Sequence, residues 1–365
     1  MPRYTPLVAS LPSTVPFVGP ETQERARGQK FAARLGANEN VFGPSPKAIA
    51  AMQAAAPDVW MYGDPENHDL KQALAAFHGV APENIVVGAG IDGLLGSLCR
   101  MLVSYGTPVV TSLGAYPTFN FHVAGYGGVL HTVPYVGDCE DPVALINKAQ
   151  EVDASLMYLA NPDNPMGTWH GADVVQEMID NVPDGTVLCL DEAYVEFAPE
   201  GTAPVFDTDN RNVIRMRTFS KAYGMAGARV GYAIGHVDLI DAFNKVRDHF
   251  GMNRASQAGA LAALGDQKYL TQTLANVNAA KARIGDIVRG YGFDPIPSAT
   301  NFVTLDCGRD GDYARSLVGA LIAQNIFVRM PFVAPQDRCI RISAGRPQDI
   351  DLFEQALPLA LETLK

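Results

Sequence analysis

The chain lacks any apolar run near the roughly 18 to 20 residues that a membrane-spanning helix needs. It also lacks a basic excess, because 39 acidic residues against 28 Lys and Arg give a formal net charge of −11. Duplex nucleic-acid binders rely on a basic face, so that class is disfavoured. The N-terminus is broken by prolines and has no apolar stretch after a basic start, so no secretory signal is expected. These absences predict a cytoplasmic protein with no membrane or nucleic-acid partner.

Metal and disulfide patterns are missing as well. The five cysteines are odd in number, far apart and never spaced as Cys-x-x-Cys, and the seven histidines never form His-Glu-x-x-His. Such spacing is typical of reduced, buried thiols, so neither disulfides nor a metal site is expected. With 365 residues, 47% of them apolar, the chain can bury a large core. An enzyme that acts on a small molecule is the class that these features favour.

The middle of the chain alternates strand-like and helical runs, which predicts an α/β fold with a mostly parallel sheet flanked by helices. Strands are expected at residues 155–160, 186–190 and 212–217, and a cluster of polar residues follows each of them. In open α/β sheets, ligands bind outside the carboxyl ends of the strands. The sequence therefore predicts that Asn164, Asp191, Tyr194 and Lys221 line one crevice.

The two ends of the chain have a different pattern from the middle. Residues 1–45 are rich in proline and read as an arm, and Ser45-Pro46 can cap a helix that begins near Lys47. Past about residue 265 the sequence predicts a long helix at 269–289, short strands at 301–305, 326–329 and 339–343, and a final helix from Pro347. We therefore predict a large domain at 46–264 and a smaller α+β domain at 265–365 to which the arm belongs.

A glycine-rich turn follows a strand expected at residues 84–87. Gly88, Gly90 and Gly93 match the Gly-x-Gly-x-x-Gly dinucleotide pattern in its strand-to-helix context. That pattern also needs an acidic residue about 20 positions on, at the end of the next strand. The strand expected at 108–113 has none, and the next acid is Asp138. What remains is an anion site at a helix N-terminus, suited to one phosphate.

Residues 217–231 place Lys221 among hydroxyls and glycines, with Arg229 eight residues on. Alone, this stretch also fits a surface lysine in a glycine-rich turn. A lysine whose amine is partly neutral can form a Schiff base with an aldehyde. A carboxylate such as that of Asp191, about 4 Å from a ring nitrogen at an effective dielectric near 20, would contribute roughly 4 kcal/mol, or about three pKa units. A pyridine nitrogen kept protonated in this way is the electron sink of pyridoxal phosphate, the cofactor that the pattern favours.

Taken together, these segments resemble the class I/II, fold-type I pyridoxal-phosphate aminotransferases, most closely the histidinol-phosphate aminotransferase group. The matching segments lie in order across most of the chain, at residues 37–46, 62–65, 161–167, 191–197, 217–231, 301–303 and 341–345. The resemblance implies a ping-pong transfer of an amino group between an amino donor, histidinol phosphate or an aromatic amino acid, and a 2-oxo acid. Decarboxylation on the same fold is the alternative, and a catalytically silent ligand-binding module is a third hypothesis.

The resemblance also implies roles around the cofactor ring. Lys221 would be the Schiff-base lysine and the proton shuttle, and Asp191 would pair with the pyridinium nitrogen. Asn164 and Tyr194 would hydrogen-bond the phenolic oxygen. Phe119 would stack on the ring, with Tyr116 as the alternative stacking residue and a place in the core as the alternative role of Phe119.

Further roles concern the cofactor phosphate. The turn at Gly90 would bring the backbone amides of Ile91 and Asp92 to the phosphate, although this chain has Gly-Ile-Asp-Gly where the group usually has Gly-Ser-Asp-Glu. Side-chain contacts are expected from three residues, namely Thr218, Ser220 and Arg229. Tyr62 would reach the phosphate from the other subunit, so the resemblance implies a homodimer with shared active sites.

The remaining roles concern the substrate. Arg341 matches the arginine that clamps the α-carboxylate, a task suited to a bidentate guanidinium. Arg329 resembles a residue that helps to bind the phosphate of the substrate, or is a structural ion-pair partner, and Asn40 is expected near the substrate. Arg254 stands where neutral residues are expected and would bind an acidic side chain or lie at a domain interface.

Overall fold

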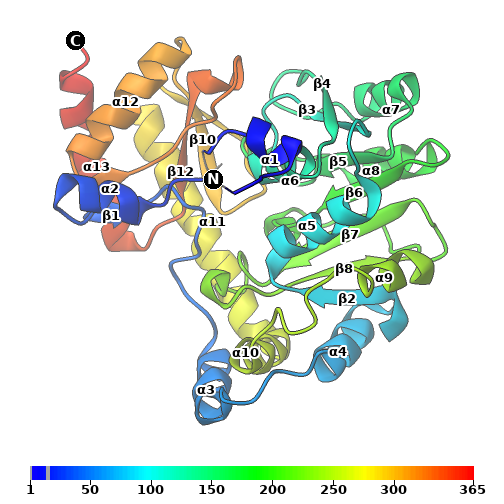
Figure 1. Cartoon of the computed structure of the whole chain (residues 1–365). Helices are drawn as coiled ribbons and strands as arrows, with labels where there is room; N and C mark the ends of the chain where they lie inside the picture. Colours follow the sequence, from blue (N-terminus) through cyan, green and yellow to red (C-terminus); the bar gives the residue numbers. More distant parts are fainter. Residues whose placement is uncertain (1, 14–16) are drawn as a thin grey trace.

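A seven-stranded sheet forms the centre of the molecule in the computed structural model, which describes residues 2–13 and 17–365. The strand order is β2-β8-β7-β6-β5-β3-β4 (Figure 1). The strands are β2 (Ile85–Gly88), β3 (Pro108–Ser112), β4 (Val129–Val133), β5 (Leu156–Ala160), β6 (Val187–Asp191), β7 (Val213–Thr218) and β8 (Gly231–Gly235). Only β8 runs antiparallel to its neighbours β2 and β7, and the other pairs are parallel. The predicted mostly parallel α/β sheet is confirmed.

Helices cover both faces of this sheet because the side chains of each strand alternate between two apolar cores. Along β5, Tyr158 packs with residues of α5 and α6 on one face, whereas Met157 and Leu159 pack with α7 and α8 on the other. The flanking helices are α5 (Gly90–Leu102), α6 (Pro117–Gly125), α7 (Pro142–Val152), α8 (Ala172–Asp180) and α9 (Val237–Phe243). The parallel strands place their carboxyl ends at one edge of the sheet, and the polar segments after β5, β6 and β7 lie at that edge.

A second group of elements lies beside the sheet (Figure 1). It contains the long helix α11 (Gln267–Gly290), α12 (Gly311–Ala323) and α13 (Pro347–Glu362). These accompany an antiparallel sheet in the order β12-β10-β9, made of β9 (Asp294–Ile296), β10 (Phe302–Asp306) and β12 (Cys339–Ser343). In the N-terminal arm, β1 (Ala33–Arg34) pairs in parallel with β11 (Ile326–Phe327). This pairing supports the assignment of the arm to the smaller domain, while the boundaries at 45 and 264 stay predictions.

The remaining helices are four in the N-terminal part of the chain and α10. They are α1 (Pro6–Ser10), α2 (Pro20–Arg27), α3 (Pro46–Ala55), α4 (His68–His78) and α10 (Arg254–Leu264). Ser45 caps α3, as predicted, because its side chain accepts a hydrogen bond from the amide of Ala48. Helices α3 and α10 pack together at the bottom of the view in Figure 1.

The predicted elements differ from the observed ones in a few places. The strands predicted at residues 155–160, 186–190 and 212–217 lie within one residue of β5, β6 and β7. The strand predicted at 326–329 is shorter, since β11 ends at Phe327 and Arg329 adds a single bridge to Arg341. Strand β8 was not recognised from the sequence. Among the described residues, no helix is long and apolar enough to cross a membrane, and no three His, Cys, Asp or Glu side chains are grouped as metal ligands.

Candidate active site

The polar segments that follow β5, β6 and β7 enclose one cavity of about 140 Å³. Residues 161–167 follow β5, Asp191 ends β6, and Lys221 comes three residues after Thr218 at the end of β7. The cavity is lined by Ile91, Asp92, Tyr116, Tyr158, Ala160, Pro162, Asn164, Asp191, Ala193, Tyr194, Thr218, Ser220, Lys221, Ala226 and Arg229. The structure therefore brings together the four side chains that were predicted to share a crevice.

Asp191 lines this cavity and is 5% exposed. Its Oδ2 accepts a hydrogen bond of 2.7 Å from the Tyr158 hydroxyl, and its Oδ1 accepts one of 3.0 Å from the amide of Ala193. Burial raises the pKa of this carboxyl to about 6, although both hydrogen bonds favour the charged form. A cationic ring nitrogen at this place would favour the carboxylate further.

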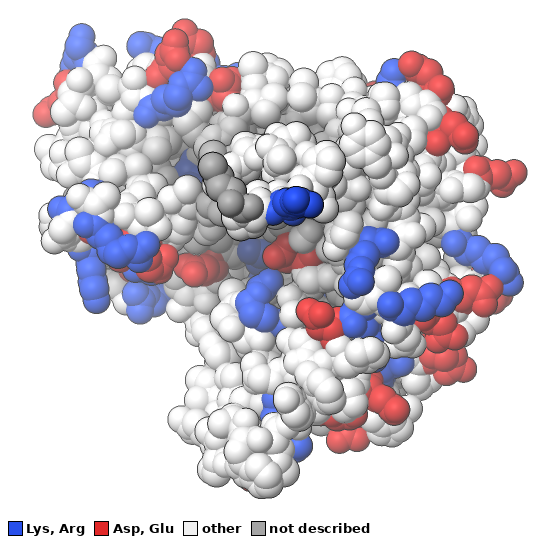
Figure 2. Space-filling model, viewed as in Figure 1, with Lys and Arg blue, Asp and Glu red and all other residues white. Residues whose placement is uncertain are grey.

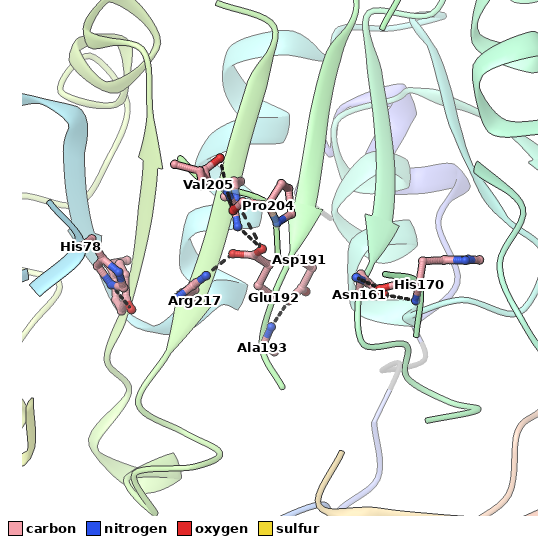
Figure 3. A network of polar contacts seen from close by, with 11 residues as sticks. His78, Asn161, His170, Asp191, Glu192, Ala193, Pro204, Val205 and Arg217 are labelled. Atoms are coloured by element: carbon pink, nitrogen blue, oxygen red, sulfur yellow. Dashed lines mark hydrogen bonds and ion pairs between the residues drawn. The ribbon is translucent and has the colours of Figure 1, made fainter. Parts of the chain in front are cut away.

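The next residue, Glu192, holds two strands together on the other side of β6. Its Oε1 lies 2.6 Å from Arg215 Nη2 and its Oε2 lies 2.8 Å from Arg217 Nε. Figure 3 shows Asp191 and Glu192 at the end of one strand, with Arg217 on the neighbouring strand. These ion pairs are nearly fully buried. They fix the register of β6 and β7, and so the positions of Asp191 and Lys221.

Lys221 has no carboxylate partner among the ion pairs described for the chain. Its Nζ donates to the carbonyl of Asn38 at 3.2 Å and lies 5.5 Å from the centre of the Tyr194 ring. Burial, together with the nearby charges of Arg341 and Arg229, lowers the pKa of this amine to about 8. A substantial fraction of the amine is therefore neutral near neutral pH, as a nucleophile requires.

Arg229 and the N-terminus of α5 form the cationic end of the cavity. Arg229 Nη1 donates to Ser220 Oγ at 3.4 Å and to the carbonyl of Ala226 at 3.1 Å, so no carboxylate among the described residues neutralises it. Gly90, with φ of +78°, lets this guanidinium approach, because a Cβ there would lie 2.5 Å from Arg229 Nη2. Helix α5 also directs the positive end of its dipole here. These donors fit one phosphate group.

Two further predicted phosphate contacts lie beside Arg229. Thr218 Oγ1 donates to the carbonyl of Val230 at 3.1 Å and accepts from the amide of Ser220 at 3.0 Å. Through these two hydrogen bonds, the Thr218 hydroxyl also shapes the turn that carries Ser220.

The carboxylate of Asp92 lies 2.7 Å from His122 Nε2, and this hydrogen bond holds the pKa of Asp92 below its usual value.

A larger cleft of about 590 Å³ shares Tyr116, Asn164, Tyr194, Lys221 and Arg229 with the cavity. Arg341, on β12, projects into this cleft and donates to Asn164 Oδ1 through Nη1. Its Nε is buried and has no hydrogen-bond partner in the described part of the chain. Burial lowers the pKa of this guanidinium. An unpaired, desolvated arginine of this kind fits an anionic ligand group.

Arg329 lines the same cleft under the N-terminal arm. Its guanidinium lies 3.9 Å from the centre of the Phe17 ring, and its Nη2 donates to the carbonyl of Val18. Burial and the charge of Arg341 lower its pKa to about 10. Because its partners are an aromatic ring and a carbonyl, the alternative role in a structural ion pair finds no support in the described residues.

Comparison with known proteins gives the family. The model of the family described as aminotransferase class I and II matches residues 32–357. The chain belongs to the class I and II aminotransferases.

The chain is similar in sequence and in structure to known members of this family. It is 35% identical over 352 residues to histidinol-phosphate aminotransferase from Anaeromyxobacter sp., covering 94% of this chain and 95% of that protein. It is 34% identical to histidinol-phosphate aminotransferase 1 from Nitrosococcus oceani, covering 94% and 93% of the two chains. The crystal structure of histidinol-phosphate aminotransferase from Sinorhizobium meliloti, in complex with pyridoxal-5′-phosphate, is 52% identical with a TM-score of 0.97, covering 100% of this chain and 99% of that one.

Two predicted site residues of this aminotransferase lie elsewhere. Phe119 is fully buried and stacks on Tyr158, with ring centres 4.5 Å apart, so it does not line the cavity. Tyr116, the alternative stacking residue, does line it. The amide of Asn40 donates to the carbonyls of Lys221 and Ala222 at 3.0 and 3.1 Å, outside the cleft. Asn40 therefore holds the backbone of the lysine loop instead of facing the substrate.

Tyr62 and Arg254 form a separate, exposed cluster. Tyr62 is 75% exposed, stacks on Phe250 with ring centres 4.4 Å apart, and lines neither the cavity nor the cleft of its own chain. Arg254 Nη2 donates to the carbonyl of Tyr62 at 3.0 Å. Arg254 therefore supports the loop of Tyr62 and does not reach the cleft.

Three residues at the site were not identified from the sequence. Tyr158 donates to Asp191 from inside β5, where its side chain reads as core. Asn38 donates to the hydroxyl of Tyr194 at 3.0 Å, and Asn301 donates to the carbonyl of Asn38 at 3.0 Å. The amides of Asn38 and Asn301 were visible as polar residues in the matching segments, but only the fold brings them together.

Proposed function

We propose that this aminotransferase uses pyridoxal 5′-phosphate to move an amino group between histidinol phosphate and a 2-oxo acid. The observation that carries the proposal is the placement of a desolvated Lys221 amine in one cavity with Asp191 and an unpaired Arg229. Three chemistries are thereby available in one enclosed space, namely a nucleophilic amine, a buried carboxylate and a phosphate cradle. The similarity to histidinol-phosphate aminotransferases supports the choice of amino donor.

The residues present fit the cofactor. Lys221 would bind its aldehyde carbon, Asp191 would hold its ring nitrogen, and Asn164 and Tyr194 would donate to its phenolic oxygen. The phosphate would be held by Thr218, Ser220, Arg229 and the amides of Ile91 and Asp92 at the start of α5. When bound, pyridoxal phosphate supplies an electron sink that stabilises a carbanion at the substrate α-carbon.

Proton transfer is the task of Lys221 in this proposal. Its Nζ, once free of the cofactor, would take the proton from the α-carbon of the substrate and deliver it to the former aldehyde carbon of the cofactor. With a pKa of about 8, about a tenth of the free amine is neutral at pH 7 and about half at pH 8, so Nζ would both accept and return a proton in this range. Tyr158, which also lines the cavity, would support the reaction by holding Asp191 Oδ2 through its hydrogen bond.

The two arginines in the cleft would bind the anionic groups of the substrates. Histidinol phosphate carries a phosphate ester and no carboxylate, whereas 2-oxo acids carry a carboxylate beside the carbonyl. Arg341 and Arg329 have no carboxylate partner of their own in the described residues, so each is free to bind either anion. One pair of guanidinium groups therefore serves both halves of a ping-pong reaction.

A cytoplasmic homodimer completes the proposal. Val59, Trp60, Tyr62 and Phe250 are exposed by 54 to 79% and gather next to α3 and α10. Figure 2 shows mainly uncharged surface over this protruding part of the molecule. A second copy of the chain would cover these side chains, and its Tyr62 would reach the phosphate end of the cavity.

The test is a half-reaction screen. The purified protein loaded with pyridoxal phosphate is mixed with single amino donors, histidinol phosphate included, and the absorbance of the cofactor is followed. Conversion to the amine form, fastest with histidinol phosphate and reversed by 2-oxoglutarate, is the expected result. Release of carbon dioxide from an amino acid without consumption of a 2-oxo acid would indicate a decarboxylase, and bound cofactor with no turnover on any donor would indicate a binding protein.

A further inference from the structure

Glu140 is a buried carboxyl that none of these roles uses. It precedes α7, is 2% exposed, and its Oε1 accepts a hydrogen bond of 3.0 Å from the amide of Ala160, the last residue of β5. Its Oε2 and the hydroxyl of Ser112 are both buried and lack a hydrogen-bond partner in the described residues. Oε2 is therefore the atom available to carry a proton, with the Ser112 hydroxyl beside it.

A second buried carboxyl, Asp163, lies in the loop that begins where β5 ends. Asp163 is 2% exposed and accepts hydrogen bonds from the Tyr135 hydroxyl at 3.0 Å and from the amide of Met166 at 2.9 Å. Burial and the proximity of Asp163 raise the pKa of Glu140 well above its usual value, and burial raises that of Asp163 to about 7. Two neighbouring carboxyl groups that are both shielded from water do not both ionise.

We propose that Glu140 is a positioning residue of this enzyme that acts in its uncharged form. Its carboxyl holds the end of β5 through the amide of Ala160. That strand end carries the loop that presents Asn164 Oδ1 to Arg341 Nη1. The role rests on the proposed aminotransferase function, and it adds a residue that orients the substrate-binding arginine without touching the substrate.

Burial and the neighbouring carboxyl groups favour the uncharged form of Glu140, whereas the Ser112 hydroxyl and the Ala160 amide favour its charged form. Asp163 and Asp191 act on it as negative groups, and Asp163 already faces the positive charge of Arg341. No Lys or Arg forms an ion pair with Glu140 or Asp163 among the described residues. With the proton on Glu140, Asp163 remains the one carboxyl that can ionise behind Arg341, and the Ala160 amide keeps its acceptor.

The test compares two substitutions at one position. Gln has the shape of a protonated glutamic acid, so Glu140→Gln is expected to leave the affinity for 2-oxoglutarate within about twofold of the wild type. Glu140→Leu removes the acceptor for the Ala160 amide, and a lost hydrogen bond of this kind is expected to weaken that affinity about tenfold. Met178→Ala, in the apolar core under α8, is the control for a general loss of packing. It should lower Tm without changing the affinity.

Affinity is read by spectral titration of the cofactor-loaded protein, so it does not require turnover. Equal losses in Glu140→Gln and Glu140→Leu would overturn the inference, because a charged glutamate would then be required. Wild-type affinity in a folded Glu140→Leu would overturn it as well. If Glu140→Leu does not fold, the infrared difference spectrum between wild type and Glu140→Gln decides. A protonated-carboxyl band at pH 7.5 supports the inference, and its absence contradicts it.

The two proposals fail in different ways. A wild type that binds 2-oxoglutarate but transfers no amino group from any donor would contradict the aminotransferase proposal, while the affinities and the infrared band would still test Glu140. A wild type that transfers amino groups while Glu140→Leu binds normally would contradict only the role of Glu140.

Discussion

At the scale of single residues, the site works because each charged group is held without its ordinary counterion. Lys221, Arg229 and Arg341 hydrogen-bond to carbonyl, hydroxyl or amide oxygens instead of carboxylates. Burial of Lys221 and Arg341 lowers the pKa of both groups, and the lack of a carboxylate partner leaves the arginines open to anions. The same amino acids on the surface would be solvated and would have ordinary pKa values.

Two aromatic residues, Tyr116 at the N-cap of α6 and Phe119 in its first turn, give a prediction at this scale. Tyr116→Leu removes an aromatic ring from the cavity wall, so it is expected to weaken the binding of pyridoxal phosphate at least tenfold. Phe119→Leu keeps an apolar side chain in the core, so it is expected to cost less than about 1.5 kcal/mol of stability and to leave binding within about threefold. Cofactor affinity from absorbance titration, with Tm as a check on folding, measures both. The opposite ranking would return the stacking role to Phe119.

This pair also shows what the sequence can predict about single residues. Asn164, Asp191 and Lys221 were placed correctly in one cavity because each follows a strand, and the carboxyl ends of parallel strands meet. Phe119 and Tyr116 lie three positions apart at the start of one helix, and a motif does not reveal which of them faces inward. The amide of Asn40 turns to the backbone of residues 221 and 222, which are distant in sequence.

At the scale of elements, the N-terminus of α5 depends on one glycine. In Gly90→Ala, the new Cβ would lie 2.5 Å from Arg229 Nη2 at a φ of +78°, so the arginine must move away. We expect cofactor affinity to fall at least tenfold. Gly93→Ala is the matched control on the same helix, since its Cβ meets nothing closer than 3.4 Å. It should stabilise α5 by about 0.5 to 1 kcal/mol without loss of affinity. Equal affinity in the two variants would exclude a role for the Arg229 approach.

The end of α4 carries a buried histidine that predicts a dependence of stability on pH. His78 Nε2 lies 2.8 Å from the Tyr232 hydroxyl on β8, and burial lowers the pKa of this imidazole to about 3. Only the unfolded chain takes up the proton between pH 6.5 and 3. The stabilising contribution of neutral His78 is therefore complete above pH 6.5 and is lost as the pH falls.

At pH 5 the expected loss is about 2 kcal/mol relative to pH 7.5, since 1.5 pH units below 6.5 correspond to that free energy. In His78→Asn no group titrates at this position. Between pH 7.5 and pH 5, the free energy of unfolding of this variant should therefore fall by about 2 kcal/mol less than that of the wild type. Urea unfolding of both proteins at the two pH values measures the difference. Parallel pH dependence in the two proteins would show that His78 titrates normally.

Elements were easier to predict from the sequence than their pairing. The periodicity of β5, β6, β7 and α11 is strong because all four are buried along much of their length, so their bounds were predicted within two residues. Strand β8 is five residues long, begins and ends with glycine, and inserts antiparallel between β2 and β7. Nothing local in Gly231–Gly235 distinguishes such a strand from a loop, because its partners on β2 are up to 149 residues away in the sequence.

At the scale of the whole molecule, the site brings together four cationic side chains of a chain whose formal net charge is −11. Lys221, Arg229, Arg329 and Arg341 line the cavity and cleft, together with the acidic Glu21, Glu39, Asp92 and Asp191. Both acidic and basic side chains are spread over the visible face, apart from the uncharged protrusion (Figure 2). Anionic groups are therefore attracted to the cationic side chains individually, and not to a site of large net positive charge.

The proposed dimer gives the last prediction, which concerns two copies of the chain. Lys221→Ala removes the amine from its own cavity, and Tyr62→Ala removes the hydroxyl that would reach the cavity of the partner. Each variant alone is expected to form dimers with two impaired sites. In a hybrid dimer, the cavity of the Tyr62→Ala chain has its own Lys221 and receives Tyr62 from the Lys221→Ala chain, so one of its two sites is intact.

Co-expression of the two variants in equal amounts makes about half of the dimers hybrid by random pairing, so about a quarter of all sites are intact. Transamination should therefore recover to about a quarter of the wild-type rate, above the rate of either variant alone. The double variant Tyr62→Ala/Lys221→Ala mixed with wild type is the control, because every hybrid site then lacks one of the two groups. If Tyr62 acted within its own chain or not at all, co-expression would give only the average of the two separate activities. That result would place the phosphate contacts entirely in one chain.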